Sequence, residues 1–107
     1  MGRGKSEAFS LKLMEYNIYL RKEAESDVSE AFEYYESCRK NLGSDFVLCI
    51  EESLSRISKN PKLNRKIHKD VRRALVKRFP YGVFYIVKDL DITVIGILHA
   101  RKKPTQW

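Results

Sequence analysis

Apolar residues recur with two different periods along this chain, and each period predicts one kind of element. Residues 14–20 alternate between apolar and polar side chains, which is the period of a β-strand. Residues 23–40 carry a stripe of apolar side chains at steps of mostly three or four residues, which predicts an amphipathic helix. The members of this stripe are Ala24, Val28, Ala31, Phe32, Tyr35 and Cys38. A second stripe of the same kind runs from Val47 to Ile57.

The short connection between these two stripes predicts an antiparallel helical hairpin. Residues 42–44 join the helices, with Gly43 placed to let the chain turn and Ser44 placed to cap the second helix. Asn60 and Pro61 then end that helix. A connection of about three residues forces two helices to lie side by side.

The C-terminal part of the chain is rich in β-forming residues. Residues 71–79, 83–87 and 92–98 are predicted to be strands, and turn residues separate them. The first of these segments carries charged residues on both faces, so we expect it to serve function as well as the core. The other two are nearly continuous apolar runs, as central strands are. The basic residues 62–69 before them are predicted to be irregular.

This order of elements predicts an α+β fold with two layers. An N-terminal strand, the helical hairpin and a three-stranded antiparallel meander follow one another as β-α-α-β-β-β. The hairpin would cover one face of a largely antiparallel sheet. A chain of 107 residues has room for one domain. We place that domain at residues 14–107, after a flexible extension of residues 1–13.

Composition predicts a cytoplasmic protein with one basic half. No apolar run reaches the roughly 18 residues that a membrane span needs, and residues 1–13 lack the apolar region of a secretory signal. Residues 1–58 hold 8 Lys and Arg against 11 Asp and Glu, a net of −3, whereas residues 59–107 hold 13 against 3, a net of +10. Such an excess favours an anionic partner, either nucleic acid or an acidic protein. Lysines that only confer solubility are the alternative.

Cysteine and histidine predict neither a metal site nor a cofactor. Cys38 and Cys49 lie in helical segments without the spacing of a zinc site, so both are predicted to fill the core in a reducing compartment. His68 and His99 are far apart in sequence, and no cluster of carboxylates accompanies them.

A set of short motifs occurs in the predicted order of elements. It comprises Tyr34-Tyr35-Glu36, Leu42-Gly43, Asn60-Pro61, Arg72, Phe79-Pro80-Tyr81 and His99-Ala100-Arg101. As a set, these motifs resemble the RelE/ParE superfamily of bacterial type II toxins over about residues 14–107. The resemblance implies a toxin that a cognate antitoxin neutralises by covering its active surface. RelE-like members cut mRNA on the ribosome, whereas ParE-like members inhibit DNA gyrase and break no bond themselves.

RelE-like and ParE-like toxins require different kinds of functional site. An endonuclease needs a base, an acid and cations near the reacting phosphate. The candidates for these roles are His99, Arg72, Arg78, Arg101 and Tyr85, with Tyr81 as another donor. A gyrase inhibitor needs only a binding surface, for which the candidates are Arg72, Arg78, His99, Arg101, Lys102 and Trp107. Simpler interpretations remain: Arg72 as a solubilising edge cation, and Tyr34, Tyr35, Tyr81 and Tyr85 as packing residues.

The ending of the chain favours the ParE-like branch. Residues 99–104, HARKKP, resemble its His-x-Arg-Arg-x-Pro type of ending, although Lys102 and Lys103 stand where that branch usually has Arg and then Asp. Gyrase inhibition is therefore the predicted function, with ribosome-dependent mRNA cleavage as the alternative. A further alternative is an inactive homologue that binds only the antitoxin and, through that complex, operator DNA.

Overall fold

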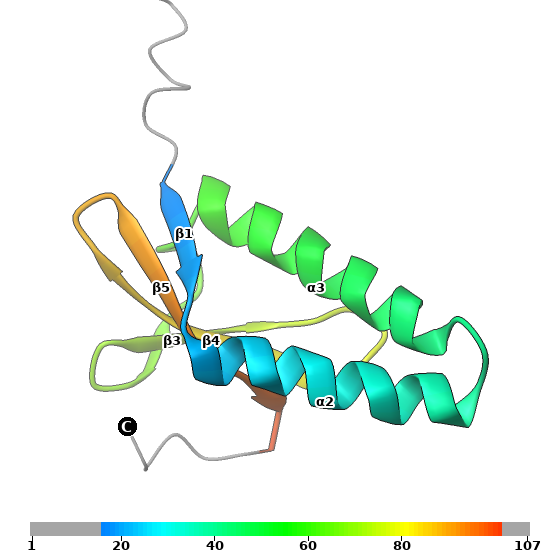
Figure 1. Ribbon diagram of the computed structural model, residues 1–107. Helices are drawn as coiled ribbons and strands as arrows, with labels where there is room; N and C mark the ends of the chain where they lie inside the picture. Colours follow the sequence, from blue (N-terminus) through cyan, green and yellow to red (C-terminus); the bar gives the residue numbers. More distant parts are fainter. Residues whose placement is uncertain (1–15, 102–107) are drawn as a thin grey trace, which may run out of the picture.

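The computed structural model describes residues 16–101, which form a five-stranded sheet with two helices packed on one face (Figure 1). In chain order the elements are β1 (Asn17–Leu20), α2 (Lys22–Cys38), α3 (Leu42–Lys59), β2 (Lys66–His68), β3 (Val71–Leu75), β4 (Tyr81–Lys88) and β5 (Asp91–His99). The predicted α+β fold, with its helical hairpin and C-terminal meander, is confirmed.

The sheet is mixed because its first strand joins it in parallel. The strand order is β1-β5-β4-β3-β2, and β1 lies parallel to β5 while the other neighbours are antiparallel. The register pairs Asn17 with Asp91 at one end and Leu20 with Val94 at the other. The rest of β5, residues 95–99, therefore extends past the end of β1 at this edge.

The core lies between the helices and the sheet. Its most deeply buried apolar residues are Ala24, Phe46, Ile50, Ile57, Val83, Tyr85, Ile92, Val94 and Ile97. A β-bulge helps to form it: Phe84 pairs with Gly96 but Tyr85 pairs with Val94, so Ile95 is inserted into β5. This insertion shifts the alternation of side chains, and Val94 and Ile97 consequently both join the main core. Ile95 packs with Phe84 in a smaller separate cluster.

The second helix begins at Leu42, two residues before the predicted start at its Ser44 cap. The left-handed residue of the connection is Asn41, with φ 71°, and not Gly43. The Glu36 carboxylate of α2 accepts hydrogen bonds from the backbone N–H groups of Asn41 (2.9 Å) and Gly43 (3.0 Å). These amides lie at the start of α3, where helices lack internal acceptors and favour negative charge. Glu36 therefore caps the start of α3, the role that was predicted for Ser44.

Gly43 is required for close packing of the hairpin. It is buried, and a Cβ at this position would lie 2.6 Å from the Phe32 carbonyl oxygen and 2.8 Å from the Phe32 ring. Such distances are far below van der Waals contact, so any side chain would push the helices apart.

Replacing Gly43 by alanine should therefore lower the free energy of unfolding, although alanine is the better helix former. Overpacking costs about 1–3 kcal/mol, and the gain in helix propensity of about 1 kcal/mol offsets only part of it. Urea denaturation of Gly43→Ala should show a net loss on the order of 1 kcal/mol. Ser44→Ala, at the exposed neighbouring position, is the control. A Gly43→Ala variant at least as stable as the unchanged chain would contradict the packing role.

Three other predictions need correction. The first meander strand, β3, ends at Leu75 and not at residue 79, because Arg78 adopts φ 73° and the Val76 N–H bonds to the Tyr81 carbonyl oxygen across a turn (2.9 Å). Part of the stretch predicted to be irregular forms β2, which pairs with β3. Cys38 is exposed because it is the last residue of α2, whereas Cys49 is buried as expected. The predicted strand start at Met14 lies outside the described residues.

Neither helix of residues 16–101 is long and apolar enough to cross a membrane. Over the same residues, His, Cys, Asp and Glu nowhere gather in a group of three or more that could bind a metal ion.

Candidate functional site

The structure divides the predicted site residues into separate groups. Arg72 and Tyr85 form the first, as paired residues on β3 and β4. The Tyr85 hydroxyl is buried and donates to the Pro61 carbonyl oxygen (2.6 Å), while the Asn64 side-chain amide donates to the same hydroxyl (3.1 Å). The Arg72 guanidinium donates to the backbone carbonyl oxygens of Asn64 (2.6 Å) and Lys62 (3.3 Å). Together these two side chains fasten the loop after α3 to the sheet.

This environment keeps the Tyr85 hydroxyl protonated. Burial raises the pKa of Tyr85, and the Asn64 hydrogen bond and the Arg72 charge oppose that shift only in part. A general base works best with a pKa near the operating pH. Tyr85 is therefore suited to donating its hydrogen bond to Pro61 and unsuited to removing a proton.

His99 and Tyr81 form the second group, at the end of β5. Tyr81 pairs with His99 across the sheet, and their ring centroids are 6.0 Å apart. The backbone N–H of Arg101 donates to Nδ1 of His99 (3.3 Å), so a neutral His99 carries its proton on Nε2. Tyr81 and Tyr85 are four positions apart in β4, a distance of about 13 Å at roughly 3.3 Å per residue. The first group bonds to the loop after α3, whereas His99 lies beside Tyr81 at the end of β5, so the two groups have separate surroundings.

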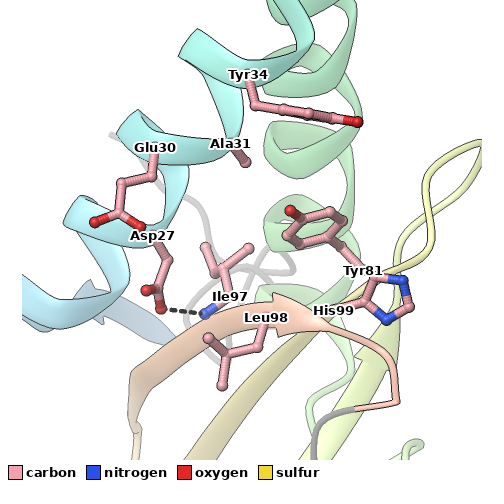
Figure 2. Close-up of a pocket in the computed structure, with 8 residues that line it drawn as sticks. All are labelled: Asp27, Glu30, Ala31, Tyr34, Tyr81, Ile97, Leu98 and His99. Atoms are coloured by element: carbon pink, nitrogen blue, oxygen red, sulfur yellow. Dashed lines mark hydrogen bonds between the residues drawn. The ribbon is translucent and has the colours of Figure 1, made fainter.

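A pocket of about 310 Å³ lies between α2 and the end of β5 (Figure 2). Its lining comprises Asp27, Glu30, Ala31 and Tyr34 from α2, with Tyr81, Ile97, Leu98 and His99 from the sheet. The Asp27 carboxylate accepts a hydrogen bond from the Ile97 N–H (3.0 Å), beyond the point where β1 ends. Figure 2 shows the rings of Tyr34 and Tyr81 on facing sides of this pocket.

The α2 side of the pocket was not predicted as a site. Tyr34 was assigned to packing, but it is 63% exposed, whereas Tyr35 does pack on the core as predicted. The available signal was the spacing of Asp27, Glu30 and Tyr34, at steps of three and four residues. This spacing places the three side chains on one side of a helix, next to the apolar stripe.

Burial raises the pKa of Tyr81 and is the largest cause of the shift. The nearby Asp27 carboxylate raises this pKa further, and the neighbouring Tyr34 and Glu30 add to the shift. An unfolded tyrosine loses its proton near pH 10, about its ordinary pKa, whereas folded Tyr81 holds the proton to higher pH. The contribution of protonated Tyr81 to the free energy of unfolding is therefore complete below about pH 10. It is lost as the pH rises through the pKa of Tyr81 in the folded protein.

The free energy of unfolding should consequently fall above about pH 10, and less steeply in Tyr81→Phe and Tyr85→Phe, since burial raises both pKa values. Urea denaturation at a series of alkaline pH values measures this effect. Equal declines in the unchanged chain and both variants would contradict it.

Arg78 lies in the turn between β3 and β4. Its φ of 73° is unusual for a residue with a long side chain and costs on the order of 1 kcal/mol. The Arg78 guanidinium pairs with the Asp45 carboxylate in the first turn of α3 (3.5 Å) and lies 5.6 Å from the centre of the Phe79 ring. These contacts hold the exposed Arg78 guanidinium beside the start of α3 and the Phe79 ring.

Backbone contacts bring the Arg78 turn next to the end of β5. The Ala100 N–H donates to the Pro80 carbonyl oxygen (2.8 Å), and Arg73, which was not predicted as a site residue, donates to the Ala100 carbonyl oxygen (3.3 Å). Arg78 is two residues from Pro80, and Arg101 follows Ala100 directly. We call the exposed residues Arg78, His99 and Arg101 the basic corner. The predicted contact residues Lys102 and Trp107 lie outside the described residues.

The fold matches a solved structure, and the sequence matches a protein family. The structure resembles that of "Chromosomal ParDE TA system from P. aeruginosa" with a TM-score of 0.71 and 16% sequence identity, over 80% of this chain and 97% of that chain. No curated protein sequence matches significantly. Residues 18–104, most of the chain, match the family described as "ParE toxin of type II toxin-antitoxin system, parDE". The chain therefore belongs to the ParE toxin family of type II toxin–antitoxin systems, within the RelE/ParE superfamily.

Proposed function

We propose that this toxin arrests growth in the cytoplasm by binding DNA gyrase, and that a cognate antitoxin neutralises it by covering the binding surface. One observation carries the proposal: the residues that a ribonuclease would need do not converge. Arg72 and Tyr85 bond to the loop after α3, whereas His99 lies beside Tyr81, about four residues further along the sheet.

The basic corner supplies the surface that an inhibitor needs. Arg78 and Arg101 are exposed on neighbouring segments, and His99, whose Nδ1 accepts a hydrogen bond from the Arg101 N–H, has its ring beside Tyr81. Guanidinium groups are common binding hot spots because they form several hydrogen bonds in a fixed plane. The corner thus suits an acidic protein surface and requires no bond to be broken by the toxin.

Membership of the ParE family implies an antitoxin partner. We infer that this antitoxin combines acidic with apolar residues, because it must meet both the basic corner and exposed side chains such as Leu75. The toxin contacts operator DNA only through that complex. The described residues show no helix-turn-helix, because α2 and α3 form an antiparallel hairpin.

Expression of the toxin alone in bacterial cells tests this proposal. We expect growth arrest with a DNA damage response, while synthesis of a reporter protein continues, and relief of both effects when the antitoxin is expressed. Rapid loss of reporter synthesis with cut messages would contradict gyrase as the target and favour mRNA cleavage. Normal growth of cells that contain folded toxin would instead favour the inactive homologue.

A further inference from the structure

A small cavity of about 130 Å³ lies between the C-terminal half of α3, the loop that follows it and β3. Ser53, Arg56 and Ile57 line it from α3, Asn64 from the loop, and Ala74 and Leu75 from β3. We call it the α3–β3 cavity. None of its lining residues lines the pocket in Figure 2 or belongs to the basic corner. It is therefore a separate site.

Ser53 places a hydroxyl without a hydrogen-bond partner in the wall of this cavity. The residue is only 1% exposed, and among the buried side-chain nitrogen and oxygen atoms of residues 16–101 only its Oγ lacks a partner. A serine inside a helix can bond to the carbonyl oxygen four residues earlier, but Ser53 does not. A buried hydroxyl without a partner destabilises the fold, so a polar group bound in the cavity would restore the lost hydrogen bond.

The apolar part of the lining suits the body of a small molecule. Ile57 and Ala74 are buried, whereas Leu63 and Leu75 are 77% and 58% exposed. The cavity therefore extends from the core to the protein surface, which gives a ligand a way in. Apolar cavities of about 150 Å³ can bind a single benzene ring. A ligand about the size of one ring consequently fits.

The charge of the lining favours a neutral ligand. Arg56 is the only charged residue among the described residues that line the cavity, and its guanidinium pairs with the Glu52 carboxylate (3.6 Å). An anion would have to compete with Glu52 for this guanidinium. A neutral molecule with a hydroxyl group can bond to the Ser53 Oγ without that competition.

Hydrogen bonds already hold the loop wall of the cavity in place. The Asn64 side-chain amide donates to the Tyr85 hydroxyl (3.1 Å), and the Arg72 guanidinium donates to the Asn64 carbonyl oxygen (2.6 Å). The Leu63 N–H donates to the Asn60 carbonyl oxygen (3.2 Å). A site that is formed before its ligand arrives loses little binding free energy to reorganisation.

We propose that the α3–β3 cavity binds a small neutral molecule that carries one hydroxyl group on an apolar body about the size of one ring. The ligand hydroxyl bonds to the Ser53 Oγ, and the apolar body contacts Ile57 and Leu75. A bound molecule joins α3 to β3 and stabilises the folded toxin. The site does not depend on gyrase being the target.

Phenol and toluene are the probes that test this proposal, because they are similar in size and only phenol has a hydroxyl. Titration of the full chain with phenol, followed by methyl NMR, should shift the signals of Ile57, Leu63 and Leu75 and saturate with a Kd on the order of 1 mM. In Ser53→Ala the ratio of phenol affinity to toluene affinity should fall about fivefold, because the hydrogen bond is lost. The ratio cancels any change in the apolar fit that affects both probes.

The matched control is Ser55→Ala, the same substitution at an exposed position of α3, which should leave the ratio unchanged. An unchanged ratio in Ser53→Ala would overturn the proposal. Phenol shifts confined to Val47 and Leu54, which line an apolar groove between the two helices, would also overturn it. So would nuclear Overhauser contacts between the Ile57 methyl group and water that persist at high phenol concentration without a shift of the methyl signal, since the cavity would then bind only water.

Discussion

Replacing Arg78 by alanine should weaken binding to gyrase by roughly 30-fold, which corresponds to a hot-spot loss of about 2 kcal/mol. The guanidinium is exposed, and the ion pair with Asp45 holds it at the edge of the turn. Arg101→Ala should have an effect of similar size. If the two losses add, the double variant binds about 1,000-fold more weakly. The measurement is the toxin concentration that halves gyrase supercoiling activity.

Two further variants separate binding from folding at this position. Arg78→Gly removes the side chain but fits φ 73° without strain, so it should lose inhibition while its thermal unfolding temperature is unchanged or higher. Lys77→Ala removes the neighbouring exposed charge and should retain most of the inhibition. Equal losses for Lys77→Ala and Arg78→Ala would show that only the total charge matters. Full inhibition by Arg78→Gly would remove Arg78 from the binding surface.

Replacing Tyr85 by phenylalanine should act on stability and leave gyrase inhibition by the folded protein unchanged. The substitution deletes the hydroxyl that joins the Pro61 carbonyl oxygen to the Asn64 amide in a buried position. Loss of a buried hydrogen-bond partner costs about 1–3 kcal/mol. Denaturation with urea, together with a supercoiling assay on folded protein, measures both effects.

Tyr34→Phe is the matched control, because it deletes the hydroxyl of an exposed tyrosine. We expect its free energy of unfolding to change by less than about 0.5 kcal/mol. A catalytic Tyr85 predicts the reverse pattern, in which activity disappears and stability is retained. That outcome would contradict the structural role of the Arg72 and Tyr85 group.

The elements that the sequence predicted well are those with a strong apolar signal. The two helices carry an apolar stripe of helical period, and the long strands β4 and β5 are nearly continuous apolar runs, so their pattern identifies them. β2 has only three residues, and its basic sequence gives no such pattern. The parallel pairing of β1 with β5 joins residues more than seventy positions apart, which local periodicity cannot indicate.

The candidate site was less predictable, because residue type does not reveal what a side chain contacts. Arg72 and Arg78 look equivalent along the chain, yet one bonds to backbone carbonyl oxygens in a loop and the other is exposed at a turn. Asp27 lies outside the predicted apolar stripe of its helix, yet its carboxylate accepts a hydrogen bond from the Ile97 N–H of β5. Both distinctions depend on contacts between distant segments, and only the folded structure supplies them.

The central claim is that this toxin acts on gyrase by contact and not on messenger RNA by cleavage. The most direct measurement combines supercoiling by purified gyrase with cleavage of a message on programmed ribosomes, each with and without the antitoxin. The account predicts inhibited supercoiling, reversed by the antitoxin, with intact message at the same toxin concentration. Cut message with unaffected gyrase would contradict the account and make His99 and its neighbouring arginines a catalytic site.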